Sequence, residues 1–205
     1  MSNTITTILF DLGGVLIDWN PRYVYHAVFN TKEEADWFLQ NICTHDWNEQ
    51  QDSGQSLQDG TEELVARHPR WEKEIRTYYQ RWSEMLGGPL PDTVELFRKL
   101  REQQRYKFYA LTNWSAETFP VALDRYEFLH WFDGILVSGA EGVRKPFPRF
   151  YELALQRFGL HPSETIFIDD NGRNVEAARA LGIKSVHFQS AEQLAAALRA
   201  ENIIF

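Results

Sequence analysis

Short apolar runs that end in polar residues recur along the chain, at residues 6–12, 107–113, 134–138, 165–170 and 185–188. Each run has the length of a strand and stops at residues that terminate strands. Segments with the apolar periodicity of a helix lie between or after these runs, at residues 92–104, 116–125, 148–158, 174–180 and 191–200. Because strands that alternate with helices are typical of α/β proteins, the pattern predicts a Rossmann-like parallel sheet of five strands.

Residues 19–88 do not follow this alternation of strands and helices. The segment contains no convincing strand and is rich in helix formers and aromatic residues, with helices expected at 32–42, 56–66 and 70–86. Asn20 and Pro21 are typical of a helix start, and glycines and prolines around residue 88 mark the exit. We therefore predict an α/β core domain from residues 1–17 and 89–205 and an inserted α-helical cap subdomain from residues 18–88.

The charge and cysteine content of the chain indicate which kinds of partner and cellular compartment to expect. The formal net charge is −8 and is spread without long runs of one sign, which argues against a nucleic-acid or anionic-membrane partner. The single cysteine, Cys43, has no internal partner for a disulfide, and the first residues lack the pattern of a secretion signal. A cytoplasmic protein with no membrane partner is expected, and its oligomeric state is left open.

Carboxylates stand at the ends of two predicted strands. Asp11 follows the first strand and precedes Gly13 and Gly14, while Asp169 and Asp170 end the fourth. Acids at the carboxyl edge of a parallel sheet are typical of an active site, although Asp before Gly is also ordinary turn chemistry. Two adjacent acids either begin the next helix or bind a hard cation such as Mg²⁺. The sequence leaves both interpretations open at this point.

Two further signals suit a phosphate group. Thr112 and Asn113 end the second strand, and Lys145 lies beside Pro146 in the loop that follows the third. A hydroxyl and an ammonium group both donate to phosphate oxygens, but each residue is also common at an exposed surface.

The four elements taken together resemble the motifs of the haloacid dehalogenase-like hydrolases, in the expected order from Ile5 to Phe188. The first motif, DLGGV, and the insert after it are similar to the phosphatase-like branch of subfamily I, whose members have a helical cap. The resemblance implies a sheet order of 5-4-1-2-3, which brings Asp11 and Asp170 to one crevice.

The resemblance also implies roles for the catalytic and substrate-binding positions. Asp11 becomes the nucleophile that forms an aspartyl-phosphate, and Thr112 and Lys145 bind the transferred phosphoryl group of a small phosphorylated metabolite such as a sugar phosphate. The expected substrate contacts are Gly14, Asn113, Trp19 and Trp114. The two indoles are expected to stack on a sugar face, although tryptophan more often serves packing.

The implied cofactor is Mg²⁺. Its expected ligands are Asp11, Asp170 and the backbone carbonyl of Gly13, and Asp169 and Asn174 are expected to support the metal. A backbone ligand does not depend on the side chain, so glycine at position 13 is compatible with this arrangement.

Gly13 is nevertheless a departure, because phosphatases of the family usually carry a second Asp there as general acid and base. General acid catalysis is worth about 10²- to 10⁴-fold in rate. We hypothesise that the cap residue His45 or Asp46, or a metal-held water, replaces it.

Two alternatives remain open. A 2-haloacid dehalogenase also lacks the second acid, and Tyr151 and Asn171 resemble that branch. Against it stand the acidic pair ending in Asp170, which a metal-independent dehalogenase does not need, and Val15 in place of an expected threonine. The other alternative is a non-catalytic protein that binds a phosphate ligand.

Overall fold

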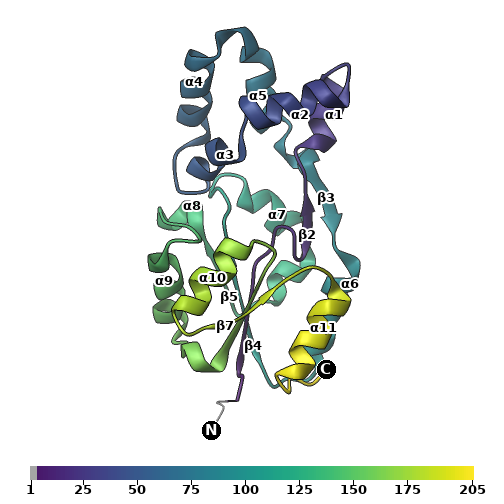
Figure 1. Cartoon of the computed structure of the whole chain (residues 1–205), viewed down its shortest axis with the longest axis vertical. Helices are drawn as coiled ribbons and strands as arrows, with labels where there is room; N and C mark the ends of the chain where they lie inside the picture. Colours follow the sequence, from purple (N-terminus) through teal and green to yellow (C-terminus); the bar gives the residue numbers. More distant parts are fainter. Residues whose placement is uncertain (1–3) are drawn as a thin grey trace.

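A five-stranded parallel sheet crosses the lower half of the molecule in the computed structural model, which describes residues 4–205 (Figure 1). Residues 1–3 of the predicted core lie outside the described range. The strands are β1 (Thr7–Phe10), β4 (Lys107–Thr112), β5 (Gly134–Val137), β6 (Thr165–Asp169) and β7 (Lys184–His187). Their order in the sheet is β5-β4-β1-β6-β7. When these five strands are numbered 1 to 5 in chain order, the sheet read from its β7 edge has the order 5-4-1-2-3. The predicted order is confirmed.

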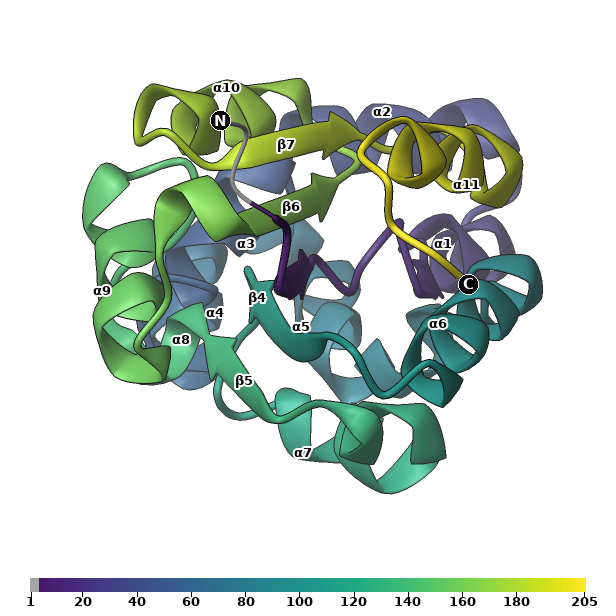
Figure 2. The ribbon, with the colours of Figure 1, turned by 90° about the horizontal axis from the view of Figure 1, so that it is seen from below.

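Helices cover both faces of the sheet (Figure 2). One face carries α9 (Pro148–Phe158) and α10 (Gly172–Ala180), and the other carries α6 (Pro91–Glu102) and α11 (Ala191–Ala200). Two short helices, α7 (Phe119–Arg125) and α8 (Ser138–Glu141), complete the core. The central strand β1 is fully buried: Leu9 packs in the cluster under α9, and Phe10 packs against Phe97 of α6. Burial on both faces explains why this strand is an unbroken apolar run.

The insert forms a helical layer above the sheet (Figure 1). Its helices are α1 (Arg22–Val28), α2 (Lys32–Asn41), α3 (His45–Gln51), α4 (Leu57–Arg67) and α5 (Glu72–Gln80). Three of them begin at a hydroxyl cap: Thr31, Thr44 and Ser56 each accept a hydrogen bond from the backbone N–H three residues ahead. Buried aromatic rings such as Tyr25 and Tyr78 fill the space between them. None of the helices formed by residues 4–205 is both long and apolar enough to cross a bilayer.

The predicted helix at 70–86 is wrong as one element. A 3₁₀ turn at Pro69–Trp71 precedes α5, and a second at Trp82–Met85 follows it. The chain leaves the helical conformation at Arg81, and Trp82 turns toward the core, where it packs against Trp114 with ring centroids 5.6 Å apart.

The expectation that the insert contains no strand is also wrong. β2 (Ile17–Trp19) pairs antiparallel with β3 (Leu86–Pro89) and forms a ribbon between the core and the helical layer. Pattern alone gives no sign of it, because the strands have three and four residues and β3 contains Gly87 and Gly88, which disfavour strand structure. The predicted domain boundaries at residues 18 and 89 both fall within this ribbon.

Candidate active site

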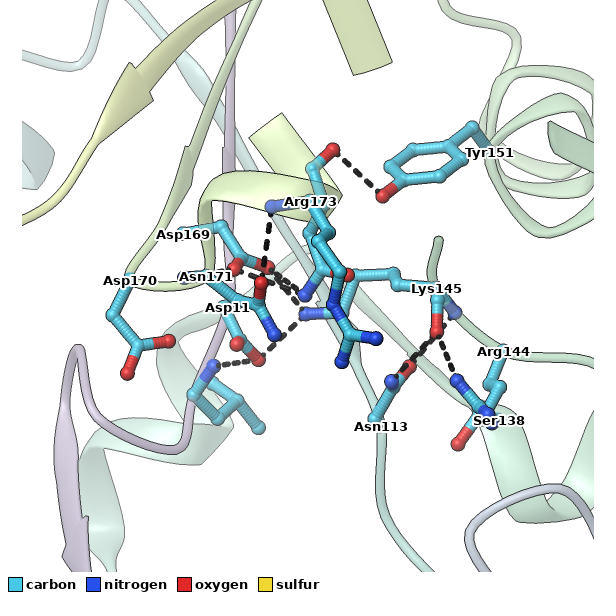
Figure 3. A network of polar contacts seen from close by, with 12 residues as sticks. Asp11, Asn113, Ser138, Arg144, Lys145, Tyr151, Asp169, Asp170, Asn171 and Arg173 are labelled. Atoms are coloured by element: carbon cyan, nitrogen blue, oxygen red, sulfur yellow. Dashed lines mark hydrogen bonds and ion pairs between the residues drawn. The ribbon is translucent and has the colours of Figure 1, made fainter. Parts of the chain in front are cut away.

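Three carboxylates meet at the carboxyl edge of the sheet (Figure 3). Asp11 directly follows β1, and Asp169 and Asp170 end β6, the neighbouring strand, whose Ile168 is in register with Phe10. One carboxylate oxygen from each acid lies within 4.8 Å of the others. Asp11 and Asp169 are buried, whereas Asp170 is exposed to solvent.

Lys145 lies fully buried behind two of these acids. Its Nζ is 2.9 Å from Asp11 Oδ1 and 2.7 Å from Asp169 Oδ2. Asn174 Nδ2 donates to both oxygens of Asp169 at 3.0 and 3.1 Å, and the Asn171 N–H donates at 2.8 Å. Because protein donors occupy both of its oxygens, Asp169 holds the lysine in place, and Asn174 holds Asp169.

The cluster has an excess of negative charge. Three ionised carboxylates and one ammonium leave two net negative charges. Burial raises the pKa of Asp11, the nearby charges of Asp169 and Asp170 raise it further, and Lys145 opposes the shift. Burial followed by the charge of Asp169 also raises the pKa of Asp170. A divalent cation with a preference for oxygen ligands would offset this charge, so the donor set fits Mg²⁺.

A cavity of about 500 Å³ opens above the carboxylates. The predicted residues that line it are Asp11, Gly13, Gly14, Trp19, Asn113, Trp114, Asp170 and Asn174. Asp169 and Lys145 are fully buried beside Asp11, and Thr112 is buried at the end of β4. His45 also lines the cavity, whereas Asp46 is exposed on the outside of α3.

Thr112 and Asn113 use their side chains differently. Thr112 is 1% exposed, and its Oγ1 has no hydrogen-bond partner among residues 4–205, so it is available to a bound ligand. Asn113 Oδ1 accepts from the Lys145 N–H and its Nδ2 donates to the Lys145 carbonyl, both at 2.9 Å. The amide of Asn113 therefore fixes the loop that carries Lys145 (Figure 3).

Gly14 forms the turn that follows Asp11. Its φ of +74° belongs to the left-handed region, and a Cβ at this position would overlap Asp170 Oδ2. Any side chain would therefore displace a proposed metal ligand.

We expect Gly14→Ala to weaken Mg²⁺ binding in addition to a conformational cost of about 1 kcal/mol. The matched control is Gly142→Ala, since Gly142 has a φ of +68° and a Cβ added there would meet no heavy atom within 4 Å. Titration of each variant with Mg²⁺ separates the two effects. A similar Mg²⁺ requirement in both variants would show that contact with Asp170 does not matter.

Comparison with known proteins identifies the family. The family model for haloacid dehalogenase-like hydrolases matches residues 5–182. The chain is a haloacid dehalogenase-like hydrolase. This hydrolase is similar to a sesquiterpene phosphatase of Aspergillus oryzae, with 30% identity over 189 residues and 91% of each chain covered.

Two solved structures share the fold of this hydrolase. A haloacid dehalogenase-family enzyme from Bacteroides thetaiotaomicron, in a magnesium complex, has a TM-score of 0.73 at 21% identity, with 96% of this chain and 100% of that chain covered. The L-2-haloacid dehalogenase from Xanthobacter autotrophicus has a TM-score of 0.63 at 21% identity, with 98% and 85% covered.

On the side of the cavity formed by the insert of this hydrolase, sequence reasoning identified Trp19 and His45 but missed four other residues. These additional lining residues are Asn48 and Glu49 in α3, Asp52 directly after α3, and Trp82. Asn48 and Glu49 are polar yet buried, which makes them candidates for the site. The amino-acid pattern of residues 45–52 is largely polar, so it does not reveal which side chains face inward.

Proposed function

We propose that this hydrolase is a Mg²⁺-dependent phosphatase of small phosphorylated metabolites, such as sugar phosphates, and that it transfers the phosphoryl group to Asp11. One observation carries the proposal: a buried carboxylate that borders a cavity, held by a buried lysine and flanked by an acidic pair. The similarity to a sesquiterpene phosphatase supports phosphate-ester chemistry. The cluster of three carboxylates supports the choice of metal, and the Bacteroides enzyme of the same fold has itself been solved in a magnesium complex.

Asp11, Asp170 and the carbonyl of Gly13 would hold the metal, with Asp169 and Asn174 behind them. When bound, Mg²⁺ supplies positive charge that offsets the charge of the phosphate and polarises its P–O bonds. This assignment agrees with the excess negative charge of the cluster.

The chain's own residues would perform the remaining steps. The Lys145 ammonium orients Asp11 through its Oδ1 and reduces the repulsion between this carboxylate and an anionic phosphate. The other carboxylate oxygen of Asp11 attacks phosphorus, and the free hydroxyl of Thr112 donates to a phosphoryl oxygen. Residues 18–88 act as a cap subdomain that contacts the leaving group, and Trp19 and Trp114 provide apolar walls for it.

We expect Thr112→Val to lower kcat by roughly 10²-fold, the usual effect of losing one donor to a developing charge. Thermal stability should stay the same or rise, because the lost hydroxyl has no partner among the described residues.

The matched control is Thr165→Val, since Thr165 is equally buried but donates to the His161 carbonyl at 2.9 Å. This variant should lose stability and keep its activity. Phosphate-release kinetics and thermal melts of both variants give the answer, and an active Thr112→Val protein would contradict the role of Thr112.

A second candidate is hydrolysis of 2-haloacids, which Gly13 favours because that reaction needs no proton donor for the leaving halide. The dehalogenase of the same fold supports only the architecture. The acidic pair argues against it, because uncompensated carboxylates beside an anionic nucleophile are electrostatically costly.

Phosphate release from a panel of phosphorylated metabolites, with Mg²⁺ or with a chelator, tests the proposed function. We expect release that the chelator and the Asp11→Asn substitution both abolish. Halide release from 2-haloacids, with no phosphate release from the panel, would replace the proposal with the second candidate.

A further inference from the structure

Asp52 stands across the same cavity as Asp11, on the side formed by the insert. It ends α3, and its Oδ2 accepts a hydrogen bond from Asn48 Nδ2 at 3.0 Å. The backbone N–H of Ser115, in the loop after β4, donates to the same carboxyl group. Its own backbone carbonyl accepts from Ser138 Oγ at 2.5 Å. Asp52 is thus fixed from both the insert and the core, and it lines the same cavity as Asp11.

Compared with solvent, the surroundings of Asp52 favour its protonated form. Burial raises its pKa to about 7, and the charge of Glu49 adds to the effect, while the Ser115 amide and Arg144 oppose it. Tyr78 and Tyr79 on α5 lie close enough to Asp52 to interact with its charge, and the Tyr79 hydroxyl donates to Asn48 Oδ1 and Gln51 Oε1. A carboxyl group that titrates near pH 7 can both give and take a proton at that pH.

Other cap residues fit the role of proton donor less well. The side chain of His45 is 69% exposed. Asp46 is exposed on the outside of α3 and is absent from the cavity lining within residues 4–205. Glu49 is engaged in an ion pair with Arg144, whose Nη2 lies 2.7 Å from Glu49 Oε2. Among the described residues, Asp52 is the remaining acid on this side of the cavity lining.

We propose that Asp52 is the general acid and base of this hydrolase, in place of the side chain that Gly13 lacks. The inference rests on the proposed phosphatase function. In the first half-reaction Asp11 forms a bond to phosphorus, the bond from phosphorus to the leaving oxygen breaks, and the Asp52 carboxyl proton moves to that oxygen to give an alcohol. In the second, water attacks phosphorus, its proton moves to the Asp52 carboxylate, and Asp11 is released together with inorganic phosphate.

Position 13 offers a way to test this role directly. A Cβ at Gly13 would meet no heavy atom within 4 Å, so a side chain can begin at this position without a clash. Gly13→Asp therefore supplies an alternative acid in the same cavity.

The test compares Asp52→Asn with the native protein on two substrates, an alkyl phosphate from the panel and p-nitrophenyl phosphate, whose leaving group needs no proton. For the alkyl ester, kcat/KM should fall by about 10²- to 10⁴-fold. The native protein should lose activity as the pH rises above about 7, where Asp52 gives up its proton, and this decline should be absent from Asp52→Asn. For the aryl ester, kcat/KM should stay nearly constant, while kcat falls and an initial burst of nitrophenol shows that phosphoenzyme accumulates.

Two further variants complete the test. Gly13→Asp combined with Asp52→Asn should restore much of the alkyl-ester activity, whereas Asp59→Asn, an exposed carboxyl group on α4, should behave as the native protein. An equal loss of kcat/KM on both esters, without rescue by Gly13→Asp, would show that Asp52 is only structural. Unchanged kinetics in Asp52→Asn would overturn the inference while leaving the phosphatase function intact. If the native protein released phosphate from neither ester, both the role of Asp52 and the proposed phosphatase function would be excluded.

Discussion

Asp11→Asn is expected to lower phosphate release by at least about 10⁴-fold, because an amide oxygen does not displace an alkoxide from phosphorus. The fold should survive the substitution. Asn keeps the shape of Asp, and burial already disfavours the charge of Asp11, as the upward shift of its pKa indicates. Lys145 keeps its 2.7 Å contact with Asp169. We therefore expect lost turnover with a thermal melting temperature close to that of the native protein.

The matched control is Asp18→Asn. Asp18 lies in β2, outside the cavity lining defined by residues 4–205, and accepts a hydrogen bond from the Tyr23 hydroxyl. This variant should retain activity. Substantial phosphate release by Asp11→Asn would exclude Asp11 as the nucleophile.

Lys145→Met is expected to lose both activity and stability. The substitution keeps the length of the side chain but leaves two buried carboxylates, Asp11 and Asp169, without their cation. Removing one partner of a buried ion pair costs about 3–5 kcal/mol in the free energy of unfolding. Chemical denaturation measures this loss. Mg²⁺ should restore part of it, because the cation offsets the same charge.

Lys107→Met provides the comparison for this prediction. Lys107 pairs with Asp133 at 3.0 Å, but its side chain is 67% exposed, so its loss should cost no more than about 1 kcal/mol. If both variants were equally stable, the buried cluster would not depend on Lys145. If Mg²⁺ stabilised neither Lys145→Met nor the native protein, the carboxylates would not form a metal site.

The sequence predicts which acids lie together, because strand ends determine their positions. In a parallel sheet the carboxyl ends of all strands meet at one edge, so acids after β1 and β6 lie close together once the strand order is correct. The role of Lys145 was predicted only from the family resemblance, as a group that binds the phosphoryl group, and the structure adds its contacts with Asp11 and Asp169. The structure adds the function of Asn113, whose amide binds the backbone of Lys145 instead of pointing freely into the cavity.

The insert was harder to predict because its contribution depends on contacts between residues far apart in the chain. Asp52 meets the loop after β4 only when α3 folds back over the core, and no local periodicity encodes that approach. Trp82 was expected inside a helix, yet it lies in a 3₁₀ turn against Trp114. The β2–β3 ribbon likewise forms from two short segments that become strands only by pairing with each other.

The most direct test of the central claim is to trap the phosphoenzyme. Native protein mixed with an equal amount of p-nitrophenyl phosphate and Mg²⁺ is quenched in acid within one turnover, and its peptides are analysed by mass spectrometry. We predict one phosphoryl group on the carboxylate of Asp11, lost after treatment with hydroxylamine and absent when the chelator is present. Release of phosphate with no covalent adduct, or with an adduct on another residue, would contradict the account.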